Sequence, residues 1–183
     1  MLEDYIIQNC APTLACIKTA NMFSCPFDSK EELVAAVRQM NRLLVPKGLR
    51  LLLLRTKQDK ALIYLYRPER LREDFKHSKA LELLHCRGYD PKSCERCIVH
   101  LAKKLRSFED FPHEIGLFLG YPPEDVNGFI EQGPDRCKCT GFWKVYDNEH
   151  EAQRIFDCYR SCTRSYCRQW QQHRDIERLT IAG

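Results

Sequence analysis

The sequence predicts an α+β protein with a small mixed β-sheet covered by helices and a long amphipathic helix at its C-terminal end. Apolar residues recur at helical spacing in several segments, and two short runs are apolar on both faces, as in covered strands. The expected order is α, β, α, β, β, several α, β, α, which is typical of a small sheet covered by helices. With 183 residues, we expect a single domain over residues 1–183.

Composition and charge exclude several classes of protein. The hydrophobic fraction of 44% and the charged fraction of 30% are typical of a globular protein rather than a disordered one. The net charge of +4 is too small to favour nucleic acid as a partner. The longest apolar run, Leu51 to Leu54, is far shorter than the roughly 20 residues of a membrane helix. Because the acidic start is also unlike a signal peptide, we expect a cytoplasmic protein without a membrane segment.

The N-terminal part predicts two helices around an ambiguous segment. A short helix is expected over residues 3–9, and residues 14–25 form either a strand or a short helical turn. Ser29 or Asp28 caps the next helix. Its apolar face recurs at i, i+4, i+7 and i+11 and consists of Leu33, Val37, Met40 and Leu44.

A β-hairpin is expected after that helix. Pro46 and Gly48 end the helix. The apolar runs 49–55 and 61–67 then form two strands joined by a five-residue loop over residues 56–60. Because both runs are apolar on both faces, we expect these strands to be central or covered by helices.

The C-terminal part predicts mainly helices. A short strand is expected over residues 140–146. The expected helices cover residues 69–87 with a break near His77 and Ser78, 92–107 after a cap at Asp90, 113–119, 123–131 and 148–173.

The chain contains eleven cysteines, and in an intracellular protein these favour thiols, metal ligands or redox groups over disulfides. The sharpest pattern is Cys94-x-x-Cys97 at the start of a helix, where the dipole favours a thiolate. Together with Cys86 and His100, the pair forms a candidate zinc or iron–sulfur site. The pair also shares the apolar face of its helix, so the structural reading is that both thiols belong to the core.

The first of two motif regions is the segment 10–21. Lys18 lies among small apolar residues and either extends to solvent or reaches a buried anion. Cys10 with Lys18 is in one interpretation an activated nucleophile. In the other interpretation the segment is a packed crossing between the first helix and the sheet. Its candidate ligand-binding residues are Cys10, Thr13, Lys18 and Asn21.

The second motif region is the segment 111–122. His113 and Glu114 are expected to open a helix, and as neighbours they do not match the H-E-x-x-H zinc spacing. Gly116 and Gly120 are four residues apart and form a smooth face that allows close approach of another backbone or a flat ligand. The structural alternative is tight helix packing. Here the candidate ligand-binding residues are His113 and Glu114, and Lys144 joins them from the strand candidate.

Five segments together resemble a known family. They are Cys10-Ala-Pro-Thr-Leu-Ala, Lys18 with Ala20-Asn21, Phe111-Pro-His-Glu-Ile-Gly, Leu119-Gly-Tyr-Pro and Gly141-Phe-Trp-Lys-Val-Tyr146. These segments are similar to those of an uncharacterised bacterial family, domain of unknown function 3793, over nearly the whole chain. The chain departs from the family pattern at Cys16, where glycine is expected, and at Thr19, where proline is expected. The resemblance implies a single domain and brings no established activity or cofactor.

Several functions follow from these patterns. The favoured one is a ligand- or partner-binding accessory module in which the two motif regions converge on one pocket. The first alternative is a thiol-dependent or acid–base enzyme with Cys10 as nucleophile and His113 as base. The second is a zinc or iron–sulfur protein through Cys94 and Cys97. The expected partner is an unknown small molecule or protein.

RNA binding is the weakest of the functions considered. Three arginines recur every fourth residue on one face of the last helix and form either a solvated face or a ridge for RNA or an acidic partner: Arg160, Arg164 and Arg168. The near-neutral charge argues against nucleic acid. The lack of a phosphate-binding glycine loop argues against a nucleotide-dependent enzyme.

Overall fold

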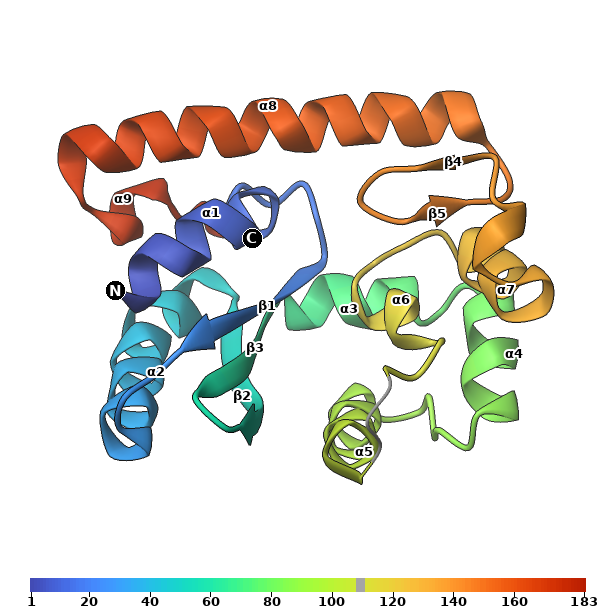
Figure 1. Ribbon diagram of the computed structural model, residues 1–183, viewed down its shortest axis with the longest axis horizontal. Helices are drawn as coiled ribbons and strands as arrows, with labels where there is room; N and C mark the ends of the chain where they lie inside the picture. The colour runs from blue at the N-terminus through green and yellow to red at the C-terminus, as the bar shows by residue number, and fades with distance from the viewer. Residues whose placement is uncertain (108–110) are drawn as a thin grey trace. The chain divides into compact units, whose positions relative to one another are not determined.

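The computed structural model describes residues 1–107 and 111–183 (Figure 1). The chain divides into two compact units. Unit 1 consists of Met1–Glu69 and Tyr159–Gly183, and unit 2 consists of Arg70–Cys158. The α+β class and the long C-terminal helix are confirmed, while the single domain stays a prediction. No helix in the described ranges is long and apolar enough to span a membrane.

Unit 1 is built on a three-stranded sheet. The strand order is β1-β3-β2 and both pairings are antiparallel, so the prediction of a mixed sheet is wrong in this respect. A two-residue turn joins β2 to β3, and a connection this short permits only antiparallel pairing. The elements of unit 1 are α1 (Leu2–Leu14), β1 (Ala20–Pro26), α2 (Lys30–Leu44), the 3-10 turn η1 (Val45–Lys47), β2 (Arg50–Lys57), β3 (Lys60–Tyr66), the later part of α8 (Glu149–His173) and α9 (Ile176–Leu179).

Helix α1 extends five residues beyond the predicted end. It includes Pro12, which the sequence rules treat as a helix breaker. Residues 10–14 are all buried, and their packing outweighs the backbone hydrogen bond that the proline removes. The helix ends at Leu14 with Ala15 as its C-cap, and Cys16 takes a positive φ of 58°.

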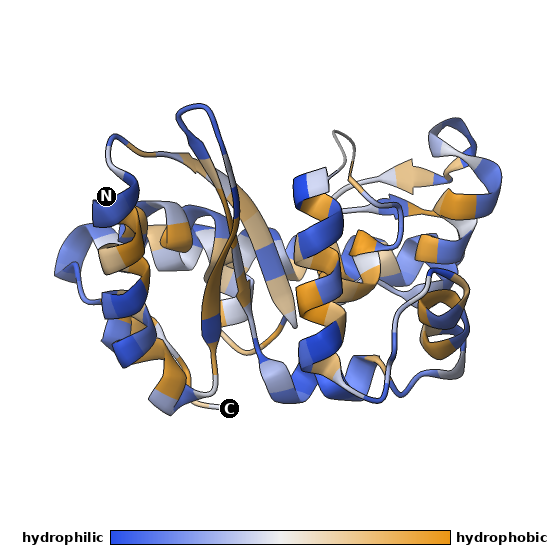
Figure 2. Ribbon diagram, turned by 90° about the horizontal axis from the view of Figure 1, so that it is seen from below, coloured by the Kyte–Doolittle hydropathy of each residue, from blue (hydrophilic) through white to orange (hydrophobic). Residues whose placement is uncertain are grey.

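The cap of helix α2, its end and the loop of the hairpin can be compared directly with the sequence predictions. Ser29 is the N-cap of α2 and accepts a hydrogen bond from the backbone N–H of Glu32 at 3.3 Å, as predicted. The helix continues into η1, and Gly48 ends η1 with a φ of 80°. The predicted five-residue hairpin loop is wrong, because Lys57 pairs with Lys60 and only two residues form the turn. In Figure 2 the strands of this sheet are largely hydrophobic and the turn is hydrophilic.

The core of unit 1 lies on one face of the sheet. Alternate residues of β3 point to this face, among them Ile63 and Leu65, and both are fully buried. Helices α1 and α2 cover the face, and Trp170 of α8 joins the same core. The two strands were predicted to be central or covered by helices: β3 is central, and β2 lies at the edge of the sheet, where α2 packs against it.

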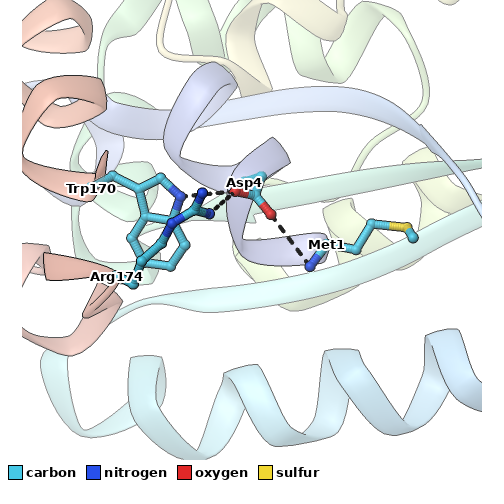
Figure 3. A network of polar contacts seen from close by, with 4 residues as sticks. All are labelled: Met1, Asp4, Trp170 and Arg174. Carbon is cyan, nitrogen blue, oxygen red and sulfur yellow. Dashed lines mark hydrogen bonds and ion pairs between the residues drawn. The ribbon is translucent and has the colours of Figure 1, made fainter. Parts of the chain in front are cut away.

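A polar network fastens α1 to the C-terminal end of α8 (Figure 3). The carboxylate of Asp4 accepts a hydrogen bond from the indole N–H of Trp170 at 2.9 Å and pairs with the guanidinium of Arg174. Its second oxygen lies 3.4 Å from the ammonium of Met1. The hydrogen bond from Trp170 is the largest influence on Asp4 and, with the cations, lowers its pKa.

Unit 2 is mainly helical. The predicted break near His77 and Ser78 is confirmed, because α3 (Pro68–Asp74) ends before His77 and α4 begins at Ser78. The expected strand over residues 140–146 is two short strands paired as a hairpin. The elements of unit 2 after α3 are α4 (Ser78–Cys86), α5 (Cys94–Ser107), α6 (Ile115–Phe118), α7 (Pro123–Gln132), the 3-10 turn η2 (Pro134–Arg136), β4 (Cys139–Thr140), β5 (Lys144–Val145) and the first part of α8.

Helix α5 begins two residues later than predicted. The carboxylate of Asp90 accepts a hydrogen bond from the backbone N–H of Lys92 and forms a local turn instead of a helix cap. The hydroxyl of Ser93 then accepts a hydrogen bond from the backbone N–H of Arg96 at 3.3 Å. Ser93, rather than the predicted Asp90, therefore caps this helix.

Aromatic contacts organise the interior of unit 2. Phe118 meets Phe75 at a centroid distance of 5.2 Å and Tyr89 at 5.4 Å. Trp143 meets Phe156 edge to face at 4.5 Å. Such pairs stabilise by about 0.5–1.5 kcal/mol beyond the area that they bury.

Candidate functional site

The first motif region forms the buried C-terminal end of α1 and its connection to β1. The hydroxyl of Thr13 donates a hydrogen bond to the side-chain oxygen of Asn21 at 2.7 Å, so the fold brings two of the candidate residues together. Lys18 is only 3% exposed, and its ammonium donates to the carbonyl of Ala20. The lysine thus reaches a buried acceptor, although this acceptor is a backbone oxygen rather than an anion.

Cys10 lies on α1 and is fully buried. Burial raises the pKa of its thiol well above the ordinary value, and the positive charge of Lys18 opposes this only in part. A nucleophilic cysteine must be both ionised and accessible. The environment of Cys10 therefore favours a protonated core thiol.

Arg67 is the residue of this region that the sequence reasoning missed. It follows β3 and is 2% exposed. Its Nε donates to the carbonyl of Thr13 at 2.8 Å, and one terminal nitrogen donates to the carbonyls of Leu14 at 3.0 Å and Ile181 at 2.6 Å. The guanidinium thus fastens the first motif to the C-terminal segment. An arginine at the end of an apolar run was the only available signal, and such residues are usually at the surface.

The second motif region places Glu114 in a buried cluster. Its carboxylate accepts hydrogen bonds from the hydroxyl of Tyr89 at 2.8 Å and from the ammonium of Lys104 at 2.7 Å. Lys104 also donates to the carbonyl of Arg87 and lies over the ring of Tyr89, 4.4 Å from its centroid. The neighbouring His113 is exposed, and its ring lies 5.3 Å from the ring of Phe129.

Two opposing effects set the ionisation of this cluster. Burial is the largest influence on Glu114 and acts to raise its pKa, but hydrogen bonds from Lys104, the backbone and Tyr89 outweigh it and lower the pKa. Burial, together with the charge of Glu114, raises the pKa of Tyr89. The cluster therefore holds an ionised carboxylate and a protonated phenol, which is an arrangement suited to fixing α5 against the second motif.

The expected helix over residues 113–119 is shorter than predicted. Glu114 lies at the N-cap position and α6 covers only Ile115–Phe118. Gly116 provides close packing inside unit 2: a Cβ there would lie 2.7 Å from Val126 and 3.0 Å from Tyr121. This face of the helix is filled by the protein's own side chains, so the structural alternative holds for Gly116.

Lys144 lies on β5 and donates a hydrogen bond to the carbonyl of Pro134 at 3.0 Å. The motif around it is organised by Asp125, which is 3% exposed. The carboxylate of Asp125 accepts hydrogen bonds from the indole N–H of Trp143 at 2.7 Å and from the backbone N–H of Tyr146 at 2.7 Å. The Gly141–Tyr146 motif is thereby explained by packing and hydrogen bonding.

The candidate metal ligands do not form a cluster. Cys94 and Cys97 are buried on α5, as the structural reading expected, whereas Cys86 is exposed. The thiol of Cys97 lies 3.2 Å from the carbonyl of Asp90, and burial raises its pKa to about 11. Across residues 1–107 and 111–183, no group of three or more His, Cys, Asp or Glu side chains is placed to hold a metal ion.

A pocket opens beside the Leu119-Gly-Tyr-Pro segment. Its volume is about 350 Å³. Tyr121, Pro122 and Pro123 line it, together with Phe75 and His77 from the segment between α3 and α4. His77 lies 3.9 Å from the carboxylate of Glu124. All of the lining residues belong to unit 2.

The candidate residues therefore belong to two groups. Four lie in unit 1 and three in unit 2, so a shared pocket stays a prediction. The group in unit 1 is Cys10, Thr13, Lys18 and Asn21, and the group in unit 2 is His113, Glu114 and Lys144.

The fold and the motifs define a small α+β protein in which Cys10, Thr13, Lys18 and Glu114 of the two motif regions are buried. The family model of DUF3793, described as a protein of unknown function, matches residues 6–180, and the chain belongs to this family. No curated protein and no solved structure matches the chain.

Proposed function

We propose that the protein is a binding module for a small molecule, with its ligand site in the pocket beside the Leu119-Gly-Tyr-Pro segment. The pocket carries the proposal, because its volume of about 350 Å³ falls within the range of small-molecule sites. The mixture of aromatic and apolar walls with a few polar groups is also typical of such sites. Three residues of the Leu119-Gly-Tyr-Pro segment line the pocket.

The chemistry of the motif residues favours binding over catalysis. Cys10 is buried with a raised pKa, which disfavours the thiol-dependent alternative. Glu114 has its hydrogen-bonding partners inside the protein, which disfavours a role as a general base. We propose a cytoplasmic location, because Cys10, Cys25 and Cys97 are free buried thiols and a reducing compartment preserves free thiols.

A fragment screen observed by NMR on the whole chain tests the proposal. Neutral aromatic fragments are expected to shift the backbone amide resonances of Gly120 and Tyr121. The variant His77→Ala removes part of the wall and is expected to weaken the fragments severalfold. His85→Ala is the matched control, because His85 is exposed on α4, of which His77 is the N-cap, and does not line the pocket. Fragments that shift no resonance of the pocket, or that bind equally to both variants, would contradict the proposal.

A further inference from the structure

A second pocket lies wholly within unit 1 and is independent of the function proposed above. It is formed where β1 ends, between the N-terminal ends of α1 and α2, and its volume is about 190 Å³. Leu2 and Tyr5 of α1 and Leu33 of α2 contribute to its walls. Phe27, in the connection between β1 and α2, adds a second aromatic side chain. The pocket is therefore predominantly apolar.

The rim of this pocket is acidic. Asp28 and Glu32 both line it and are exposed. Within the described ranges neither carboxylate has an ion pair or a side-chain hydrogen bond. No lysine or arginine is among the lining residues. The ammonium of Met1 borders the pocket but is paired with Asp4 at 3.4 Å.

The helix dipole explains only part of this acidity. Acidic residues in the first turn of a helix are favourable, which accounts for Glu31 as well as for Glu32. Asp28 precedes the N-cap Ser29 and is outside the helix. Glu31 also differs from the rim carboxylates because it accepts a hydrogen bond from Ser29 at 3.2 Å and does not line the pocket.

We propose that this pocket binds a small organic cation, an ammonium group carried on an aromatic or branched apolar body. The apolar body enters between Tyr5, Phe27 and Leu33, and the ammonium remains at the rim beside Asp28 and Glu32. The volume of about 190 Å³ equals roughly six liquid water molecules at about 30 Å³ each, so it accommodates a single ring with a short chain.

The probe for this proposal is phenethylamine, compared with two isosteres of similar shape. The neutral isostere is 2-phenylethanol and the anionic one is 3-phenylpropionate. Calorimetry or NMR titration of the whole chain is expected to give saturable binding for phenethylamine, weaker binding for the alcohol and none for the carboxylate. Binding of the amine is expected to weaken as salt is added, because the rim charges are exposed.

Variants of similar size separate the rim charge from the fold. The double variant Asp28→Asn with Glu32→Gln is expected to weaken phenethylamine about tenfold, the combined effect of two exposed ion pairs. Glu31→Gln is the matched control and is expected to leave the affinity unchanged. Ala36→Leu places a larger side chain in the wall and is expected to abolish binding of the amine and the alcohol alike.

Three results would overturn the proposal: no binding of phenethylamine at millimolar concentration, equal affinity for 3-phenylpropionate, or an unchanged affinity in the double variant. A thermal melt of each variant without ligand verifies that it is folded. Because the two pockets have separate resonances, failure here is distinguishable from failure of the site in unit 2.

Discussion

Replacing Arg67 tests whether one buried guanidinium holds the C-terminal segment against the first motif. The variant Arg67→Met keeps a long apolar side chain and removes all of the donors. Arg67→Lys keeps the positive charge but loses the planar group that reaches several acceptors at once. The carbonyls of Thr13, Leu14 and Ile181 accept hydrogen bonds from the Arg67 guanidinium within 3.0 Å, and the carbonyl of Lys47 accepts one at 3.4 Å.

The expected magnitude follows from these contacts. Hydrogen bonds to a charged group contribute about 1.5–3 kcal/mol each. Two of the acceptors keep other partners, since the carbonyl of Leu14 also accepts from the backbone N–H of Ile181 and that of Thr13 from the backbone N–H of Cys16. Removal of the buried cation also ends its desolvation penalty. We therefore expect Arg67→Met to lower the free energy of unfolding by about 3 kcal/mol, and Arg67→Lys by about 2–4 kcal/mol.

Urea unfolding measures the loss of stability, and hydrogen exchange locates it. The amide of Ile181, which donates to Leu14 at 3.0 Å, is expected to exchange faster in Arg67→Met than in the wild type, and this increase should exceed that of the amides of the central strand. Arg50→Lys serves as the exposed control and is expected to change stability by less than about 0.5 kcal/mol. A loss below about 1 kcal/mol for Arg67→Met, with unchanged exchange at Ile181, would refute the reasoning.

Three other perturbations have defined outcomes. The lowered pKa of Asp4 contributes stability that is complete above its ordinary pKa of 3.8 and is lost as the pH falls through the pKa of the folded state. The free energies of urea unfolding of Asp4→Asn and the wild type should therefore differ at pH 7 and converge near about pH 2. A difference that stays constant with pH would contradict this. In Gly141→Ala the new Cβ would lie 2.2 Å from the ring of the fully buried Phe156. A thermal melt should therefore show that the free energy of unfolding falls by about 1–3 kcal/mol. An unchanged melt would mean that the ring moves aside without cost. Iodoacetamide should modify Cys10 only as fast as the protein unfolds, and rapid modification in the folded state would restore the thiol-enzyme hypothesis.

Some functional expectations were accessible from the sequence because they depend on residue chemistry alone. The burial of Cys94 and Cys97 was predictable because both lie on the apolar face of their helix with Ile98 and Leu101. The contact between Thr13 and Asn21 involves two residues that the sequence had already selected as candidates. The partners of Glu114 were not accessible, since Tyr89 and Lys104 reach it from other parts of unit 2.

The sequence by itself determined the elements whose signals are local. The apolar face and Ser29 cap of α2 and the break before α4 depend on residues within a few positions of one another. Tertiary structure decided the rest. Helix α1 continues through Pro12 because its last turn is buried, and Arg67 meets carbonyl acceptors 20 to 114 positions away along the chain. Such contacts depend on how the elements pack, and no periodicity or spacing in the sequence encodes which distant carbonyl or carboxylate a side chain will reach.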